Sequence, residues 1–213
     1  MRLNRRQSIL AVGCAAAALI AGARLAAAHA SADPTIASIR TSTARYRNLK
    51  NALADGYIRD PMNMCITPKD EGQPEWLGAM GVHFFRPDLL GITGTSPRVN
   101  GTGTHTDFAK PGVLIYEPQA DGSMRLVAVE NLVFEKAWHD AGHTEPPTYN
   151  GDSYFHMIDN PETPADEAHG FAPHYELHIW TELPNPAGPY MEWNTKATCR
   201  YHHADPSAPA TKS

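Results

Sequence analysis

The chain has 213 residues, and its 42% hydrophobic and 19% charged content is typical of a globular protein with a sizeable apolar core. Acidic residues outnumber basic ones by 23 to 18, and no basic cluster follows residue 30. This balance argues against a nucleic-acid partner and against binding to an anionic membrane surface. The expected partner is a metal ion, a small molecule or another protein.

Residues 1–30 have the pattern of a cleaved export signal. The Arg5–Arg6 pair precedes an apolar run, and Ala-His-Ala at 28–30 matches a cleavage site. The pair also resembles a twin-arginine signal. Because Arg24 interrupts the apolar run, we expect no stable insertion in a membrane. The predicted location is periplasmic or extracellular.

Removal of this segment and its four arginines would leave 183 residues with a formal charge of −9. This length suits a single globular domain, predicted over residues 31–199, with a mobile C-terminal tail over 200–213. The oligomeric state is left open.

The mature chain is predicted to begin with one helix. Asp33 and Pro34 suit its N-cap and first turn, an apolar stripe with three- and four-residue steps follows, and Gly56 suits its end. A proline-rich loop over 57–76 comes next.

The rest of the chain is mainly predicted as strands. These lie at 79–85, 113–117, 124–134 and 174–182, with a hairpin turn at Asp121–Gly122. The Gly- and Thr-rich segment 91–111 is predicted as a loop, either a lid or disordered. The fold class is therefore α+β, an N-terminal helix followed by a curved, mainly antiparallel sheet or partial barrel.

After loss of residues 1–30, Cys65 and Cys199 are the two remaining cysteines. In an oxidising compartment they most simply form one disulfide.

Three polar residues interrupt apolar strands and are the candidate metal ligands: His83, Glu130 and His178. By period two, Glu130 shares a row with Leu126, Ala128 and Leu132, where an ionised carboxylate needs a partner. Two imidazoles and a carboxylate on neighbouring strands suit Zn²⁺, Cu²⁺, Fe²⁺ or Mn²⁺. Glu117 and His139 are candidates for a further ligand or a supporting group.

Two other interpretations of the trio stay open: a non-catalytic pocket that orients a small ligand, and core histidines that only complete hydrogen bonds. The histidines of His-Asp-Ala-Gly-His (139–143) have the spacing of a zinc-peptidase motif. Asp140 stands where the glutamate base belongs, and Gly142 disfavours the required helix. No nucleophile elbow or dinucleotide fingerprint occurs, so the catalytic residues are unassigned.

Several blocks resemble a family of exported bacterial proteins. These are STARYRNLKNALADGY (42–57), GAMGVHF (78–84), LIYEP (114–118), VAVEN (127–131), ELHIW (176–180) and NPAGPYMEWNTKATC (185–199). They follow the family's order across nearly the whole mature domain, and three of them carry His83, Glu130 and His178. The family has no established activity, so the resemblance implies export and a shared site but no reaction.

Overall fold

The strand patterns of the sequence assemble into one antiparallel sheet. In the computed structural model, residues 34–203 are described, so the predicted signal segment and the end of the predicted tail lie outside the described residues. The strands are β1 (Ile58–Arg59), β2 (Cys65–Ile66), β3 (Gly81–Phe85), β4 (Ile92–Gly94), β5 (Asn100–Gly101), β6 (Val113–Pro118), β7 (Met124–Phe134), β8 (Thr148–Tyr149), β9 (Asp152–Ser153), β10 (Phe155–Met157) and β11 (His174–Ile179). The order in the main sheet is β1-β3-β6-β7-β11-β10, with β2 also paired to β3.

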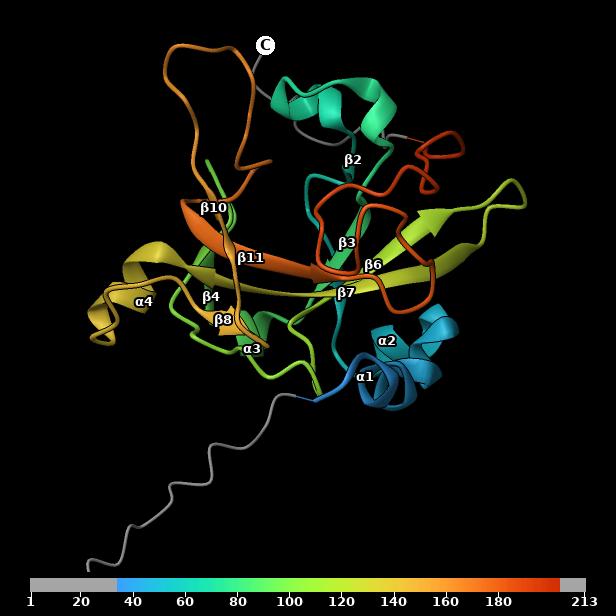
Figure 1. Cartoon of the computed structure of the whole chain (residues 1–213), viewed down its shortest axis with the longest axis horizontal. Coiled ribbons are helices and arrows are strands. Elements are labelled where there is room, and N and C mark those ends of the chain that lie inside the picture. The colour runs from blue at the N-terminus through green and yellow to red at the C-terminus, as the bar shows by residue number, and fades with distance from the viewer. Residues whose placement is uncertain (1–33, 204–213) are drawn as a thin grey trace, which may run out of the picture. The chain divides into compact units, whose positions relative to one another are not determined.

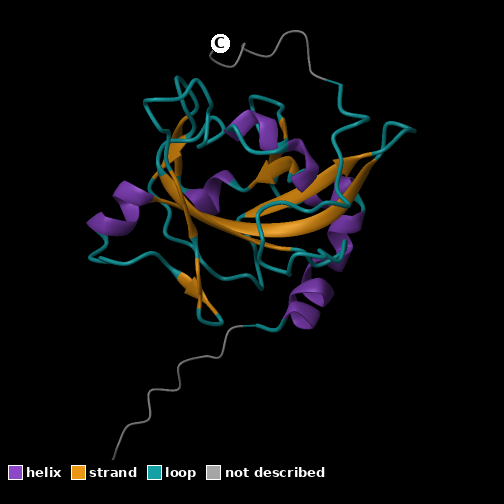
Figure 2. Ribbon diagram, turned by 45° about the horizontal axis from the view of Figure 1, so that its top comes forward, coloured by secondary structure: helices purple, strands orange, loops and turns teal. Residues whose placement is uncertain are grey.

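The helical elements are short. They are α1 (Ile36–Thr43), η1 (Ala44–Arg47), α2 (Leu49–Ala54), η2 (Pro68–Glu71), η3 (Glu75–Leu77), α3 (Pro87–Leu90) and α4 (Glu135–Asp140), where η marks a 3-10 helix. Among the described residues, no helix is both long and apolar enough to cross a membrane. The mixture of helix and antiparallel sheet confirms the predicted α+β class. The path of strands is open at β1 and β10, so the sheet is not a closed barrel, and Figure 2 shows its long strands as curved.

The predicted single N-terminal helix is divided into three pieces. Thr35 caps α1 by accepting a hydrogen bond from Ser38 N at 3.2 Å. Asn48 interrupts the helical path with extended backbone and caps α2 through its side chain. After α2, Gly56 has a φ of +92°, which agrees with its predicted role at the helix end.

The sheet has a different apolar core on each face. The helix-side core includes Ile39, Val82, Leu114, Val133 and Leu177, and Figure 1 shows α1 and α2 together beside the sheet. The site-side core includes Phe85, Ile115, Ala128, Phe171 and Trp180. The candidate ligands belong to strand rows on this second side.

The prediction that Leu126 shares a row with Glu130 in β7 is wrong, because the pairing of β6 with β7 has a register shift between Ile115 and Tyr116. Ala128 and Leu132 belong to the site-side core as expected, but Leu126 belongs to the helix-side core. The extra residue at the shift reverses the alternation, so strict period two fails there.

The predicted long loop over 91–111 has structure of its own. It contains the β4–β5 pair, and Val99 and Phe108 are fully buried. Val99 also forms a bridge with Phe171, through hydrogen bonds to Gly170 O and from Ala172 N. Val99 and Phe108 therefore anchor this segment in the core.

The predicted disulfide between Cys65 and Cys199 is present. Cys65 lies in β2, opposite Val82 of β3. The bond therefore joins the C-terminal segment to the strand pair that carries His83.

Candidate metal centre

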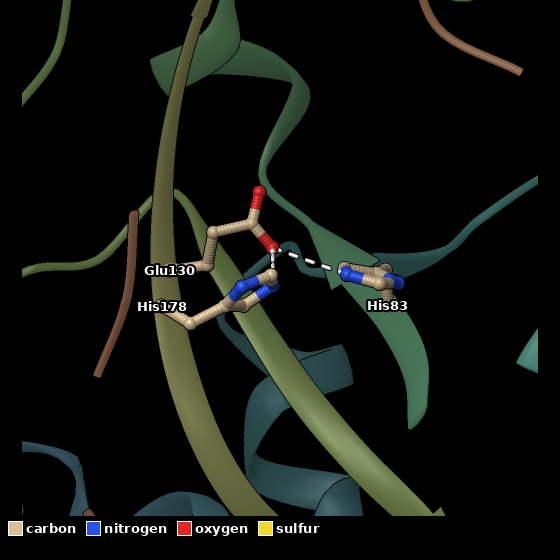
Figure 3. A group of neighbouring side chains, drawn as sticks. All are labelled: His83, Glu130 and His178. Atoms are coloured by element: carbon tan, nitrogen blue, oxygen red, sulfur yellow. Dashed lines mark ion pairs between the residues drawn. The ribbon is translucent and has the colours of Figure 1, made fainter. Parts of the chain in front are cut away.

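The sheet brings His83, Glu130 and His178 together. Glu130 in β7 lies directly opposite His178 in β11. His83 comes from β3, on the other side of β6, and its ring reaches toward the same carboxylate (Figure 3). Three strands that are distant in sequence thus meet at one carboxylate.

One oxygen is the common point of the trio. Glu130 Oε2 lies 3.1 Å from His83 Nε2 and 3.2 Å from His178 Nε2. The three residues are only 4%, 1% and 0% exposed, respectively. Their donor atoms lie within 4.8 Å of one another, which is close enough for a single ion.

Hydrogen bonds do not account for this arrangement. Among the described residues, His83 Nε2, both ring nitrogens of His178 and both carboxylate oxygens of Glu130 are buried without a hydrogen-bond partner. Buried polar groups are normally satisfied, and a cluster of exceptions needs an explanation. These atoms are also good ligands for a borderline cation.

The charges of the trio are strongly coupled. Burial and the neighbouring Glu176 oppose ionisation of Glu130, but His83 and His178 lower the pKa of this carboxyl below its usual range. Burial alone would lower the pKa of His178, whereas the close approach and charge of the Glu130 carboxylate raise it. The trio therefore favours an ionised carboxylate next to positive charge.

Glu117 and His139 do not join the trio in the structure. Glu117 accepts a hydrogen bond from Thr198 N at 3.0 Å and forms an ion pair with Arg125. His139 lies on α4, where Nε2 is 3.2 Å from the Tyr175 hydroxyl and Nδ1 is 2.8 Å from His143 O. Neither residue belongs to a potential metal-binding group in the described part of the chain.

The structure adds a second buried set that the sequence interpretation missed, formed by His169, His174 and Glu176. His174 shares the period-two row of Glu176 and His178, so the alternation in β11 could have identified it. His169 follows an irregular segment and has a φ of +35°, and no sequence pattern indicated it.

The outer groups of this region are acidic. Burial raises the pKa of Glu71, which lies beside His169. Burial, together with the charges of Glu176 and Glu71, raises the pKa of Glu192 to about 7. The buried region around the two sets therefore combines four imidazoles with four carboxyl groups, two of which have a raised pKa.

No family model, curated protein or solved structure matches the chain.

Proposed function

We propose that the protein is an exported metal-binding protein in which His83, Glu130 and His178 hold a transition-metal ion. The observation that carries this proposal is the group of buried nitrogen and oxygen atoms that converge without hydrogen bonds. A cation would provide the missing partner for all three side chains.

The distances within the trio fit a bound cation. Ligand atoms about 2.0–2.1 Å from a tetrahedral ion are separated from each other by about 3.3–3.5 Å. The two nitrogen–oxygen distances of 3.1 and 3.2 Å are close to that separation. A structural network of the same residues would have similar nitrogen–oxygen distances, but it would also have the hydrogen-bond geometry that these atoms lack.

The enclosure of the trio supports an ion over an organic ligand. All three side chains are buried, and their donor atoms lie too close together to surround an organic molecule. A set of two histidines and one carboxylate leaves coordination positions open on Zn²⁺ or Fe²⁺. A metal held in this way would supply Lewis-acid or redox chemistry, so we extend the proposal to metal-assisted chemistry on a molecule small enough to reach an open coordination position of the ion.

Export to the periplasm or the cell exterior belongs to the same proposal. The disulfide Cys65–Cys199 agrees with an oxidising compartment. The twin-arginine-like segment and the resemblance to exported bacterial proteins point in the same direction. Export of a folded protein is compatible with metal loading before export.

Metal analysis of the full chain recovered from the exported fraction tests the proposal. We expect bound transition metal in the wild type. His83→Ala and His178→Ala should each lose the ion held by the trio. His139→Ala is the matched control, because it removes a histidine outside the trio, and it should retain the metal. Metal-free wild type with density for an organic molecule would support a ligand-binding module instead. If the wild type contains neither a metal nor an organic molecule, the histidines have only a structural role.

A further inference from the structure

The second buried set lies beside the first. Glu176 Oε2 is 3.0 Å from His174 Nε2 and 3.4 Å from His169 Nε2. His169 is 1% exposed, and His174 and Glu176 are fully buried. This arrangement repeats the first trio, because two imidazole nitrogens again face a single carboxylate oxygen.

The contacts of His174 determine which of its ring nitrogens is available to a cation. Its Nδ1 lies 2.9 Å from Ala172 O, and a carbonyl oxygen only accepts hydrogen bonds, so Nδ1 carries the proton. Nε2 lies 3.0 Å from Glu176 Oε2, where it donates a hydrogen bond if the ring carries a second proton and directs a lone pair at the carboxylate if the ring is neutral. Two facing lone pairs repel each other unless a proton or a metal ion lies between them.

His169 has the environment of a metal-binding histidine on both sides of its ring. Nδ1 lies 3.4 Å from Glu71 Oε1, and Nε2 faces Glu176. Histidine ligands in proteins commonly direct one nitrogen to the metal and the other to a carboxylate or carbonyl that fixes the ring. For His169 the carboxylate beside the second nitrogen is that of Glu71. For His174 the carbonyl beside the second nitrogen is Ala172 O.

Some outer atoms of this set have no hydrogen bond, whereas the atoms that face Glu176 Oε2 are not among the unpartnered ones. Glu176 Oε1, His169 Nδ1 and Glu71 Oε1 are buried without a hydrogen-bond partner. His169 also has left-handed backbone, which is uncommon for a residue with a side chain and is often found at functional sites.

One ion cannot serve both sets. His178 faces Glu130 with Nε2, while its Nδ1 lies 3.9 Å from Glu176 Oε1. The lone pairs of the two nitrogens of an imidazole diverge, so the ring of His178 separates the two positions. The rings of His83 and His169 also stack, with centroids 5.7 Å apart.

We propose that His169, His174 and Glu176 form a second position for a divalent transition-metal cation, so that the protein binds two ions per chain. This inference deepens the proposed function and rests on its claim that the buried region binds metal. Glu71 is a positioning residue for His169 in this arrangement.

Zn²⁺ titration of the metal-stripped full chain, with the bound metal counted by mass spectrometry, tests the second position. We expect two ions per chain in the wild type. One ion should remain in His174→Ala, in His169→Asn and in His83→Ala. Asparagine tolerates left-handed backbone, so His169→Asn removes the ring with little effect on the chain path. His156→Ala, which removes an exposed histidine of β10, should retain two ions.

The outcomes separate the two proposals. A single ion that is lost in His83→Ala but kept in His174→Ala would overturn the second position and leave the proposed function intact. No bound ion in the wild type would overturn both. If the variants fail to fold, anomalous diffraction at the zinc edge from wild-type crystals loaded with Zn²⁺ decides. Two peaks, one within each set, support the inference, and a single peak beside Glu130 contradicts it.

Discussion

At the scale of single residues, Glu130 controls the electrostatics of the centre. Its carboxylate lies in the interior, where an isolated charge would be very costly. His83 and His178 lie within ion-pair distance and offset that cost when they carry protons. A metal ion offsets the same charge without those protons. The centre can therefore exchange protons for a cation, and its behaviour should depend on pH.

In the metal-free protein, we expect stability to decrease from pH 5 to pH 8. The lowered pKa of Glu130 contributes stability above about pH 4.3, which is lost only as the pH falls through its folded-state value. The raised pKa of His178 contributes stability below about pH 6.5, which is lost as the pH rises through its folded-state value. Glu192, with its pKa raised to about 7, likewise loses its contribution between about pH 4.3 and 7.

Bound metal should show the opposite trend. Its imidazole ligands must be deprotonated, so the stabilisation by Zn²⁺ should grow as the pH rises. Thermal melting of metal-free and Zn²⁺-loaded protein between pH 5 and 8 measures both trends. A stabilisation by Zn²⁺ that does not change with pH would contradict the exchange of protons for metal.

At the scale of elements, the sheet order creates the site from distant sequence. β6 separates β3 from β7, so His83 must reach across a neighbouring strand to meet Glu130. The pairing of β7 with β11 places His178 directly opposite Glu130. The loop that carries His169 has only an isolated backbone bridge, between Val99 and Phe171, in place of such a ladder.

How much of this could be predicted from sequence differs from element to element. His83, Glu130 and His178 were found because each interrupts an apolar strand pattern with period two. Strand order and register are set by long-range pairing, so their convergence on one oxygen could only be hypothesised. The break at Asn48 was missed because the apolar stripe continues across it. His169 lies in a loop whose other residues contact Arg98, and it has a left-handed backbone; neither feature leaves a periodic pattern.

Arg98 should hold the loop that positions His169. Its guanidinium donates to Phe171 O at 2.8 Å and pairs with Asp159 and with Asp166, the latter at 2.9 Å. Arg98→Ala should accelerate hydrogen exchange over residues 159–171 and weaken Zn²⁺ binding at the second position by about tenfold. Arg47→Ala is the matched control, because it breaks a two-bond pair with Glu182 elsewhere. Unchanged exchange in Arg98→Ala would contradict this role.

Gly78 marks a close crossing between the entry to β3 and the C-terminal segment. Ala79 and Asn194 form a bridge there, and a Cβ on Gly78 would lie 2.0 Å from Asn194 O. The φ of +100° also disfavours any other residue. Gly78→Ala should therefore lower the free energy of unfolding by about 2 kcal/mol or more, measured by denaturant titration.

The Gly122→Ala substitution separates backbone strain from steric clash as causes of that loss of stability. Gly122 also has a positive φ, of +80°, but a Cβ added to it would meet no atom within 4 Å. Backbone strain alone should make this substitution cost about 1 kcal/mol. Equal losses at the two glycines would show that the crossing with Asn194 adds nothing.

At the scale of the whole molecule, the disulfide connects β2 to the C-terminal segment. Cys65 and Cys199 are 134 residues apart in sequence, so their bond closes a loop that includes every candidate ligand. The C-terminal segment also contributes Ala197 to the site-side core. The position of this segment over the sheet therefore depends on both the covalent link and apolar packing.

Loss of this bond should be among the most destabilising single changes in the molecule. Closing a loop of this length restricts the unfolded chain by about 5 kcal/mol in the chain-entropy model, a value comparable to the whole stability of many domains. Cys65→Ala/Cys199→Ala and the reduced wild type should therefore unfold at much lower denaturant concentration than the oxidised protein. Both should also bind Zn²⁺ more weakly, because β2 pairs with the strand that carries His83. If the reduced protein keeps the stability of the oxidised one, the bond serves no structural purpose and an oxidising compartment is not needed for the fold.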